Sequence, residues 1–511
     1  MTMQFIYIKR LAIAFTAVVL ISSCKKFLDI NKDPDRIPDS NPPVAQLLTS
    51  AQMNLSFEAG SDLFRYATLI AQQMSGQASQ PNQTYEYDRY NITGSDENNV
   101  WGSIFATTLS DIEIIIKQAQ AIGAPHYAGV AKILKAYEYS LAVDAWGDVP
   151  YSEAEQLLEN TAPHYDDDAA IYPKLIQLLI DAVADLNQAT SSLSPGSNSL
   201  IYPNSSFSTA KTQWIKLANT LRLRLYLHYS KKDPAYTVAQ ITTLVNAAGI
   251  KFFESNSDNF QMVFNNAANQ RNPISQFEVS RPNYLFASAT MVNMMNAKSD
   301  PRRATYFTPF PWASSPATYK GVTPGDPATV NYSRIYTFLR GTATGTPTPN
   351  ASGGITASSL TFSGTAPQRM LSFAEYNFIR AEAALMGAPG DPQAFFTAGI
   401  TASMKEAGIS DANITTYLAA NGTLAGTNAQ KLKQIIEEKY VASFGVSVEP
   451  WTDWRRTAYP ALTPPSNHIA PVTNVPRSLF YAQSEIDLNP NIPNPGQNKP
   501  TDLQSKVFWD N

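Results

Sequence analysis

Apolar residues recur at helical spacing in five separate segments of the chain. Residues three and four positions apart lie on one face of an α-helix, so each segment predicts an amphipathic helix. The stripes run over residues 130–141, 175–186, 214–225, 376–386 and 432–440. Small residues such as Ala128-Gly129 stand where helices would cross, which favours closely stacked helix pairs of the tetratricopeptide kind, although no 34-residue period is kept. The aspartates at 166–168 are predicted to cap the second of these helices.

Two long polar stretches interrupt the helical pattern. Residues 76–99 are rich in tyrosine and amide side chains, and residues 283–366 combine scattered aromatics with a Gly/Thr/Ser/Pro segment. Loops of this length in a compact protein are usually functional or disordered. The last 60 or so residues are dense in Pro and Asn, and we expect them to wrap the scaffold as an extended tail.

The N-terminus has the layout of a secretory signal. Lys9 and Arg10 precede an apolar run from Leu11 to Ile21, and two serines then lead to Cys24. The run is too short to span a bilayer. Cys24 is the only cysteine, and its position resembles a bacterial lipobox, so we predict removal of residues 1–23 and lipidation of Cys24. One acyl chain holds a protein only marginally, so stable anchoring implies more than one.

Composition narrows the choice of partners. The formal net charge is −4 over 511 residues, and removal of Lys9 and Arg10 with the signal makes the mature chain more acidic. An acidic chain without a basic run argues against nucleic acid as a partner. With its single cysteine committed to lipid, the chain forms no internal disulfide and must be stable through packing alone.

Signals for catalysis are weak. The four histidines, at 126, 164, 228 and 468, make no zinc-binding spacing. The sequence has no nucleophile elbow, phosphate-binding loop or dinucleotide fingerprint. A pair of glycosidase carboxylates leaves no linear motif, so this class stays untested by sequence. We therefore predict a protein that is not an enzyme, with no catalytic residues, metal or cofactor.

Aromatic residues in the polar loops are the best indication of ligand binding. A loop Tyr or Trp offers a flat apolar face with a polar edge, which suits a sugar ring. The candidates are Tyr85, Tyr87, Tyr90, Trp312 and Tyr319. The alternative for the first three is a short strand whose tyrosines cap the helical core, because Tyr is often partly buried. Trp101, Trp146 and Trp214 lie on or beside helical stripes and are predicted to be core.

Six motifs in chain order resemble the SusD/RagB-like nutrient-binding lipoproteins. They are residues 24–34 (CKKFLDINKDP), 146–154 (WGDVPYSEA), 213–225 (QWIKLANTLRLRL), 300–307 (DPRRATYF), 374–383 (AEYNFIRAEA) and 449–456 (EPWTDWRR). The resemblance covers nearly the whole mature chain. It implies an all-α, tetratricopeptide-like scaffold with long decorating loops and little β structure.

The resemblance also implies a function and a domain organisation. It implies an outer-membrane lipoprotein facing the cell exterior that captures a nutrient, an oligosaccharide above all, and serves as lid for a SusC-like TonB-dependent transporter. Two alternatives stay open: a lid with little binding of its own, and a peptide-binding module that uses its helical face. Residues 24–511 are expected to form one domain. Its helical scaffold is placed at about 44–235 and 367–445, and its ligand-side loops at about 76–99, 236–366 and 446–511.

Overall fold

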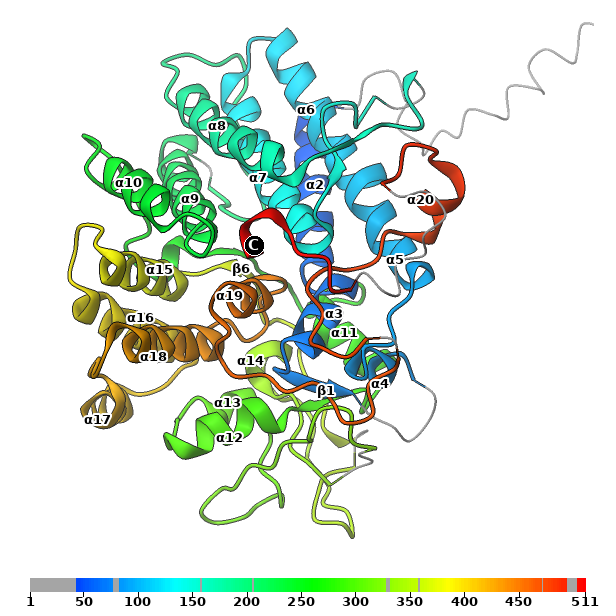
Figure 1. The fold of residues 1–511 in the computed structure, drawn as a ribbon, viewed down its shortest axis with the longest axis vertical. Helices are drawn as coiled ribbons and strands as arrows, with labels where there is room; N and C mark the ends of the chain where they lie inside the picture. The colour runs from blue at the N-terminus through cyan, green and yellow to red at the C-terminus, as the bar shows by residue number, and fades with distance from the viewer. Residues whose placement is uncertain are drawn as a thin grey trace, which may run out of the picture.

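The computed structural model describes residues 43–76, 82–156, 159–204, 206–327, 331–356, 359–470, 472–493 and 503–511. Helices make up most of this part of the chain, and its strands are two to four residues long. The long helices lie side by side through the upper and left parts of Figure 1, and the loops of residues 306–366 project at its lower end. The predicted all-α architecture is confirmed.

The first group of helices comes from the N-terminal half of the chain. Its members are α2 (Val44–Glu58), α5 (Gly94–Trp101), α6 (Ser110–Ala121), α7 (Pro125–Trp146), α8 (Asp168–Leu186), α9 (Phe207–His228) and α10 (Pro234–Val245), with a π-helix, η2 (Gly102–Leu109), joining α5 to α6. Helix α7, which with α9 is the longest of the group at 22 residues, packs along both α6 and α8. The predicted stripes of α7, α8 and α9 face the core, and Trp101, Trp146 and Trp214 are all buried.

The second group comes from the C-terminal half. It comprises α15 (Phe373–Met386), α16 (Pro392–Glu406), α17 (Asp411–Asn421), α18 (Asn428–Ala442) and α19 (Glu449–Thr457). Helix α15 packs against α16 and α18 and also contacts α9, so it joins the two groups. Residues Phe378, Ile400 and Ile435 form part of a second apolar cluster between these helices.

Local capping explains where several of these helices begin and end. The Asp167 carboxylate accepts a hydrogen bond from the backbone N–H of Ala169 and starts α8, as the aspartate run predicts. Ser372 caps α15 in the same way, and Gly387 ends it in the left-handed region at φ +113°. Thr427 and Gln430 form a capping box at the start of α18.

The remaining elements are short. Three antiparallel strand pairs join β1 (Met74–Gly76) to β5 (Leu285–Ala287), β2 (Val149–Pro150) to β3 (Tyr165–Asp166), and β4 (Phe260–Met262) to β6 (Gln368–Leu371). The short helices are α3 (Asp62–Ile70), α4 (Gln83–Asp88), α11 (Pro273–Ser280), α12 (Ala289–Ala297), α13 (Arg303–Tyr306), α14 (Thr337–Arg340), α20 (Gln483–Leu488), η4 (Asn256–Asp258) and η6 (Phe508–Asp510).

All three regions expected to be loop-rich contain helices, and residues 236–366 include α11, α12, α13 and α14. Residues 76–99 include α4 and α5, because Asn82 accepts a hydrogen bond from the Tyr85 N–H and Thr93 forms a capping box with Asp96. The C-terminal region includes α19, whose Trp451 is fully buried. The rest of this region crosses the scaffold as expected: the indole N–H of Trp146 donates to the carbonyl of Phe480 at 2.7 Å.

A network of buried charges ties the two helical groups together. Arg224 of α9 binds both carboxylate oxygens of Glu375 in α15, at 2.7 Å each. Lys439 of α18 binds Glu449 of α19 at 2.6 Å, and Glu449 in turn accepts a hydrogen bond from His228 of α9. Every side chain in this network is buried. The paired charges therefore connect α9, α15, α18 and α19 across the middle of the molecule.

Candidate functional site

The loops gather at one end of the molecule, which we call the loop face. It is formed by residues 281–366 together with β1, α4 and the segment 458–470, at the lower end of Figure 1. Hydrogen bonds fix these distant segments together: Gln72 donates to the carbonyl of Thr463 at 2.7 Å, and Asn467 donates to the carbonyl of Gly325 at 2.7 Å. Long segments that lie far apart in sequence are thus held as one surface.

A cavity of about 650 Å³, the loop-face cavity, opens between α12 and the segment 460–466. This volume falls within the range typical of small-molecule sites. Its wall is mixed, with alanines, prolines and a methionine beside polar groups. The polar side chains are Gln72, Thr290, Asn293, Thr323, Glu437, Thr463 and Ser466, and one of them, Glu437, is a carboxylate. Amide and hydroxyl groups both donate and accept hydrogen bonds, which suits a polyhydroxylated ligand.

A second, smaller cavity of about 200 Å³ lies among the loops of residues 283–356. We call it the Arg334 cavity. Side chains in its wall include Asn283, Thr308, Tyr332, Arg334, Asn350 and Thr356. Main-chain hydrogen bonds connect this cavity to the loop-face cavity. The N–H of Ala287 donates to the carbonyl of Ser333, next to Tyr332 and Arg334, and the carbonyl of Ala287 accepts from the N–H of Val322, next to Thr323. The two cavities therefore belong to one surface.

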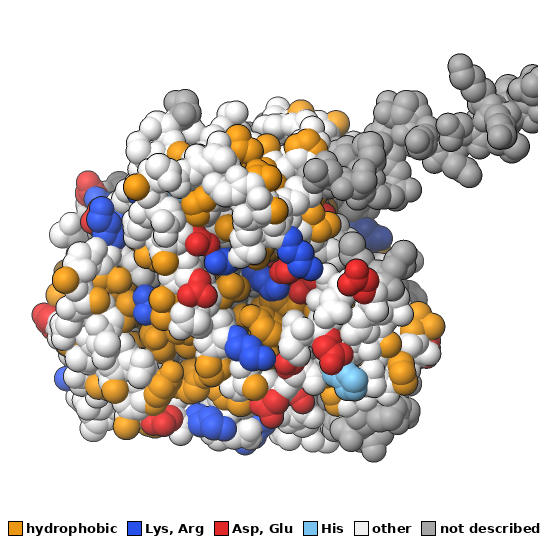
Figure 2. Space-filling model, turned by 90° about the horizontal axis from the view of Figure 1, so that it is seen from above, with side chains coloured by type: hydrophobic (Ala, Val, Ile, Leu, Met, Phe, Trp, Pro, Cys, Tyr) orange, Lys and Arg blue, Asp and Glu red, His pale blue; other side chains and the backbone are white. Residues whose placement is uncertain are grey.

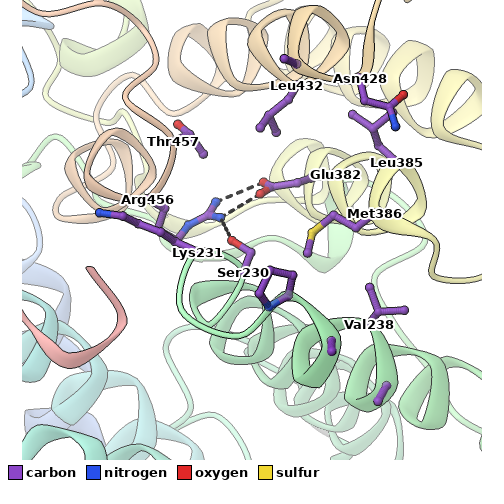
Figure 3. Close-up of a pocket in the computed structure, with 14 residues that line it drawn as sticks. Ser230, Lys231, Val238, Glu382, Leu385, Met386, Asn428, Leu432, Arg456 and Thr457 are labelled. Carbon is purple, nitrogen blue, oxygen red and sulfur yellow. Dashed lines mark hydrogen bonds and ion pairs between the residues drawn. The ribbon is translucent and has the colours of Figure 1, made fainter. Parts of the chain in front are cut away.

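A third cavity, of about 870 Å³, lies elsewhere, among the helices α10, α15, α18 and α19. We call it the helical groove. Figure 3 shows the aliphatic side chains of Val238, Leu385 and Leu432 around it, with Arg456 bridging to Glu382 and Ser230 at one end. Seen from above, the helical end of the molecule is also hollowed and carries apolar side chains among charged ones (Figure 2). An apolar groove between helix pairs suits a peptide better than a sugar.

Of the three predicted tyrosines in and just after α4, only Tyr85 is partly exposed. Tyr87 and Tyr90 are 1% and 2% exposed. The Tyr87 ring packs edge-on against Tyr66 at 4.8 Å between centroids, and its hydroxyl donates to Asp96 at 2.9 Å. Both rings are buried in the core: α4 carries Tyr87, and Tyr90 lies in the turn that follows α4. A ligand role can be proposed only for Tyr85, whose hydroxyl accepts a hydrogen bond from Asn467 at 3.2 Å.

The other two candidates are partly exposed on the loop face, although neither lines one of the cavities described above. Trp312 packs beside Ile355 and Phe362, and its backbone N–H donates to Gly353 at 2.7 Å, next to the Arg334 cavity. Tyr319 lies 5.3 Å from the guanidinium of Arg303, measured to the ring centroid. Both rings are accessible, and we therefore retain Trp312 and Tyr319 as proposed ligand contacts.

The predictions for the N-terminus concern residues outside the described ones. The signal of residues 1–23 and the lipidation site Cys24 both precede residue 43, where the description starts. Among the described residues, no helix is long and apolar enough to cross a membrane. Nor do those residues contain a group of three or more His, Cys, Asp and Glu side chains arranged to hold a metal ion.

The cationic character of the Arg334 cavity was not predicted from the sequence. The stretch from 327 to 374 contains Arg334, Arg340 and Arg369 and no acidic residue at all. In the fold, Arg334 and Arg340 are 5% and 4% exposed. Burial lowers the pKa of Arg340 to about 10, against the opposing effect of nearby Glu278. The missing signal was this local charge imbalance, which the small overall charge of the chain concealed.

Comparison with known proteins identifies the family of the chain. The profile of a SusD-like family described as "Starch-binding associating with outer membrane" matches residues 35–482. The chain belongs to this family. The resemblance read from the motifs is thereby confirmed. SusD-like proteins are binding proteins associated with the outer membrane, which supports a nutrient-binding role.

Solved structures of SusD-like proteins have the same fold. A chitin-binding protein is 25% identical, with a TM-score of 0.71 over 90% of this chain and 99% of that chain. A chitin-binding SusD homologue from Flavobacterium johnsoniae is 22% identical, with a TM-score of 0.71 over 91% and 98% of the two chains. A SusD homologue from Bacteroides fragilis is 22% identical, with a TM-score of 0.70 over 92% of this chain and 100% of that chain. No curated protein sequence matches the chain.

Proposed function

We propose that this SusD-like protein is a cell-surface lipoprotein that captures an oligosaccharide on its loop face. The observation that carries the proposal is the family match over residues 35–482. The loop face supports it, because the loop-face cavity is large enough for a small ligand and is lined by amides and hydroxyls. Tyr85, Trp312 and Tyr319 stand on the same face and would supply the apolar surface that a sugar ring needs.

The proposal also includes an anchor and a partner. Lipidation of Cys24 would hold the protein on the outer membrane, facing outward, above a SusC-like TonB-dependent transporter. The protein would act as the lid of that transporter, with the helical side docked on it and the loop face holding the nutrient. The tether raises the local concentration of lid and transporter, so modest affinity for the nutrient is sufficient.

Calorimetric titration of the mature chain, with Cys24→Ser to keep it unlipidated, tests the proposal. The ligands are pooled neutral oligosaccharides, acidic oligosaccharides and peptides. Saturable heat with an oligosaccharide pool, at a Kd of roughly 1 μM to 1 mM, is the expected result. The absence of heat with every pool would contradict capture by the protein alone and would favour the alternative, a lid whose ligand is held mainly by the transporter.

One observation favours a second function, peptide binding. The helical groove is larger than the loop-face cavity and is walled mainly by aliphatic side chains. A matched pair of variants separates the two functions by placing the same bulky cation in each cavity: Asn293→Arg in the loop-face cavity and Leu432→Arg in the helical groove. Sugar capture predicts that only Asn293→Arg weakens binding. Loss of binding in Leu432→Arg alone would identify the helical groove as the site.

A further inference from the structure

The Arg334 cavity differs from the rest of the loop face in its charge. Arg334 and Arg340 are both buried, and the only carboxylate within 4 Å of either among the described residues is Glu278, whose Oε2 lies 3.5 Å from Nη2 of Arg334. Glu278 is itself 1% exposed. Two cations thus share one anion. Of the two, Arg334 lines the cavity, and the guanidinium of Arg340 lies 4.0 Å from the centroid of the Phe362 ring. The described cavity wall contains no acidic side chain that would balance the second positive charge.

The guanidinium groups are also short of hydrogen-bond acceptors. Nε and Nη1 of Arg334 and Nε of Arg340 are buried and have no hydrogen-bond partner among the described residues. Leaving a charged donor unbonded away from water costs free energy that an acceptor would recover. Burial accordingly lowers the pKa of Arg334 and raises that of Glu278, opposing the charged form of each. The surroundings of Arg334 and Arg340 therefore favour the binding of an anion.

The remaining wall provides groups that suit a sugar. Tyr332 presents a partly exposed ring, with the ammonium of Lys320 4.6 Å from its centroid. The Oδ1 of Asn350 accepts hydrogen bonds from Ser352 and Gly354 within its own turn. Its Nδ2 makes no hydrogen bond to a described residue, so that N–H group is available to a ligand. A flat ring, an amide donor and nearby cations are compatible with a sugar ring that bears a negative charge.

We propose that the Arg334 cavity binds a sugar residue carrying an anionic group, a carboxylate or a sulfate ester, within the captured oligosaccharide. This inference rests on the proposed function, because it specifies the ligand of the same loop face. At about 200 Å³ the cavity is smaller than a typical small-molecule pocket, so it would take one ring while the rest of the chain lies outside it. A guanidinium recognises either anion through paired N–H donors.

The test compares ligands that differ only in charge. A galacturonate tetramer is titrated into the mature Cys24→Ser chain beside its methyl ester, and a sulfated galactose tetramer beside its desulfated form. We expect one charged form to bind about tenfold or more tightly than its neutral partner, and the preference to fall as salt is raised. A preference for the galacturonate identifies a carboxylate, and a preference for the sulfated tetramer identifies a sulfate.

A variant tests whether the preference for a charged ligand arises at the Arg334 cavity. Asn350→Asp adds a carboxylate to the wall without burying a new charge, so it should fold, and we expect it to weaken the charged ligand about tenfold. Asn413→Asp, on the exposed start of α17, adds the same charge elsewhere and should leave binding unchanged. Thermal melting of both variants confirms that they are folded.

The outcomes are distinct. Equal affinity for charged and neutral forms would overturn the anionic site while leaving oligosaccharide capture in place. A charge preference that survives Asn350→Asp would also overturn it, because the anion would then bind at another position. Failure of all four tetramers and of every neutral pool to bind would instead refute the proposed capture itself.

Discussion

Buried arginines occur in both halves of the molecule, but their surroundings differ. In the helical scaffold, Arg224 binds the two carboxylate oxygens of Glu375 at 2.7 Å each, and Arg456 binds Glu382 and Asp453 at 2.8 and 2.6 Å. On the loop face, the nearest carboxylate to Arg334 is 3.5 Å away and is shared with Arg340. Charges with close carboxylate partners fix helices relative to one another. A guanidinium with only one distant carboxylate partner has N–H groups available to bind a ligand.

The largest expected effect comes from breaking a scaffold pair. Arg224→Ala would leave Glu375 and Glu449 buried beside fewer cations, and we expect a loss of about 3–5 kcal/mol in the free energy of unfolding. Urea denaturation of wild type and variant measures it. Arg334→Ala is the matched comparison and should cost clearly less, because it removes one long contact. Equal losses would show that the two regions do not differ as the geometry indicates.

A somewhat smaller loss is expected from Tyr87→Ala. The ring is buried against Tyr66, and its hydroxyl bond to Asp96 is lost as well. Removal of a buried aromatic side chain costs about 3 kcal/mol or more. The same denaturation experiment tests it, with Tyr87→Phe separating the hydroxyl from the ring. A variant as stable as wild type would place Tyr87 on the surface after all.

The pH dependence of stability should also distinguish the two regions. Burial raises the pKa of Asp88, at the loop face, to about 8, although Gly325 and Gly76 donate backbone hydrogen bonds to it. The native state then holds its proton between about pH 4 and 8 while the unfolded chain has lost it. Stability from this group therefore falls as pH rises through that window.

Glu438 of the scaffold behaves in the opposite way. Burial alone would raise its pKa, but Lys298 and Arg302 outweigh burial and lower the pKa to about 2. Its contribution is present above about pH 4.5 and is lost as pH falls toward 2. Melting curves from pH 3 to 9 should show Asp88→Asn flattening the decline above pH 4, by a few degrees in Tm, and Glu438→Gln flattening the acid limb. Unchanged profiles would contradict both assignments.

The sequence predicted the scaffold well, but it did not indicate that two of the five proposed ligand residues, Tyr87 and Tyr90, are buried, and the reason is physical. The stripes of α7, α9 and α15 are determined by local periodicity, which a sequence displays directly. Caps at Asn82 and Thr93 turn an expected loop into two helices, with Tyr87 buried on α4 and Tyr90 buried in the turn between them. Polar residues at such positions are easily taken for loop residues.

The Arg334 cavity was harder still to predict. It combines Asn283, Thr308, Tyr332 and Asn350, which meet only through the pairing of distant segments. Charge imbalance over residues 327–374 was visible in the sequence. That those arginines are buried, with one carboxylate between two of them, follows from tertiary structure alone.

The smallest expected effect on stability concerns Tyr85, and it is informative for that reason. The ring is partly exposed on α4, 5.2 Å from the guanidinium of Arg89, and its hydroxyl contacts only the side chain of Asn467 among the described residues. Tyr85→Ala should therefore change the free energy of unfolding by less than about 1 kcal/mol. If the ring stacks on a sugar, the same substitution weakens oligosaccharide binding several-fold in the calorimetric titration. Tyr87→Ala, two positions away, should show the opposite pattern: a large loss of stability and little direct effect on ligand binding, since its ring is part of the core. Unchanged binding in Tyr85→Ala would remove this residue from the ligand site and leave Trp312 and Tyr319 as the aromatic contacts to test.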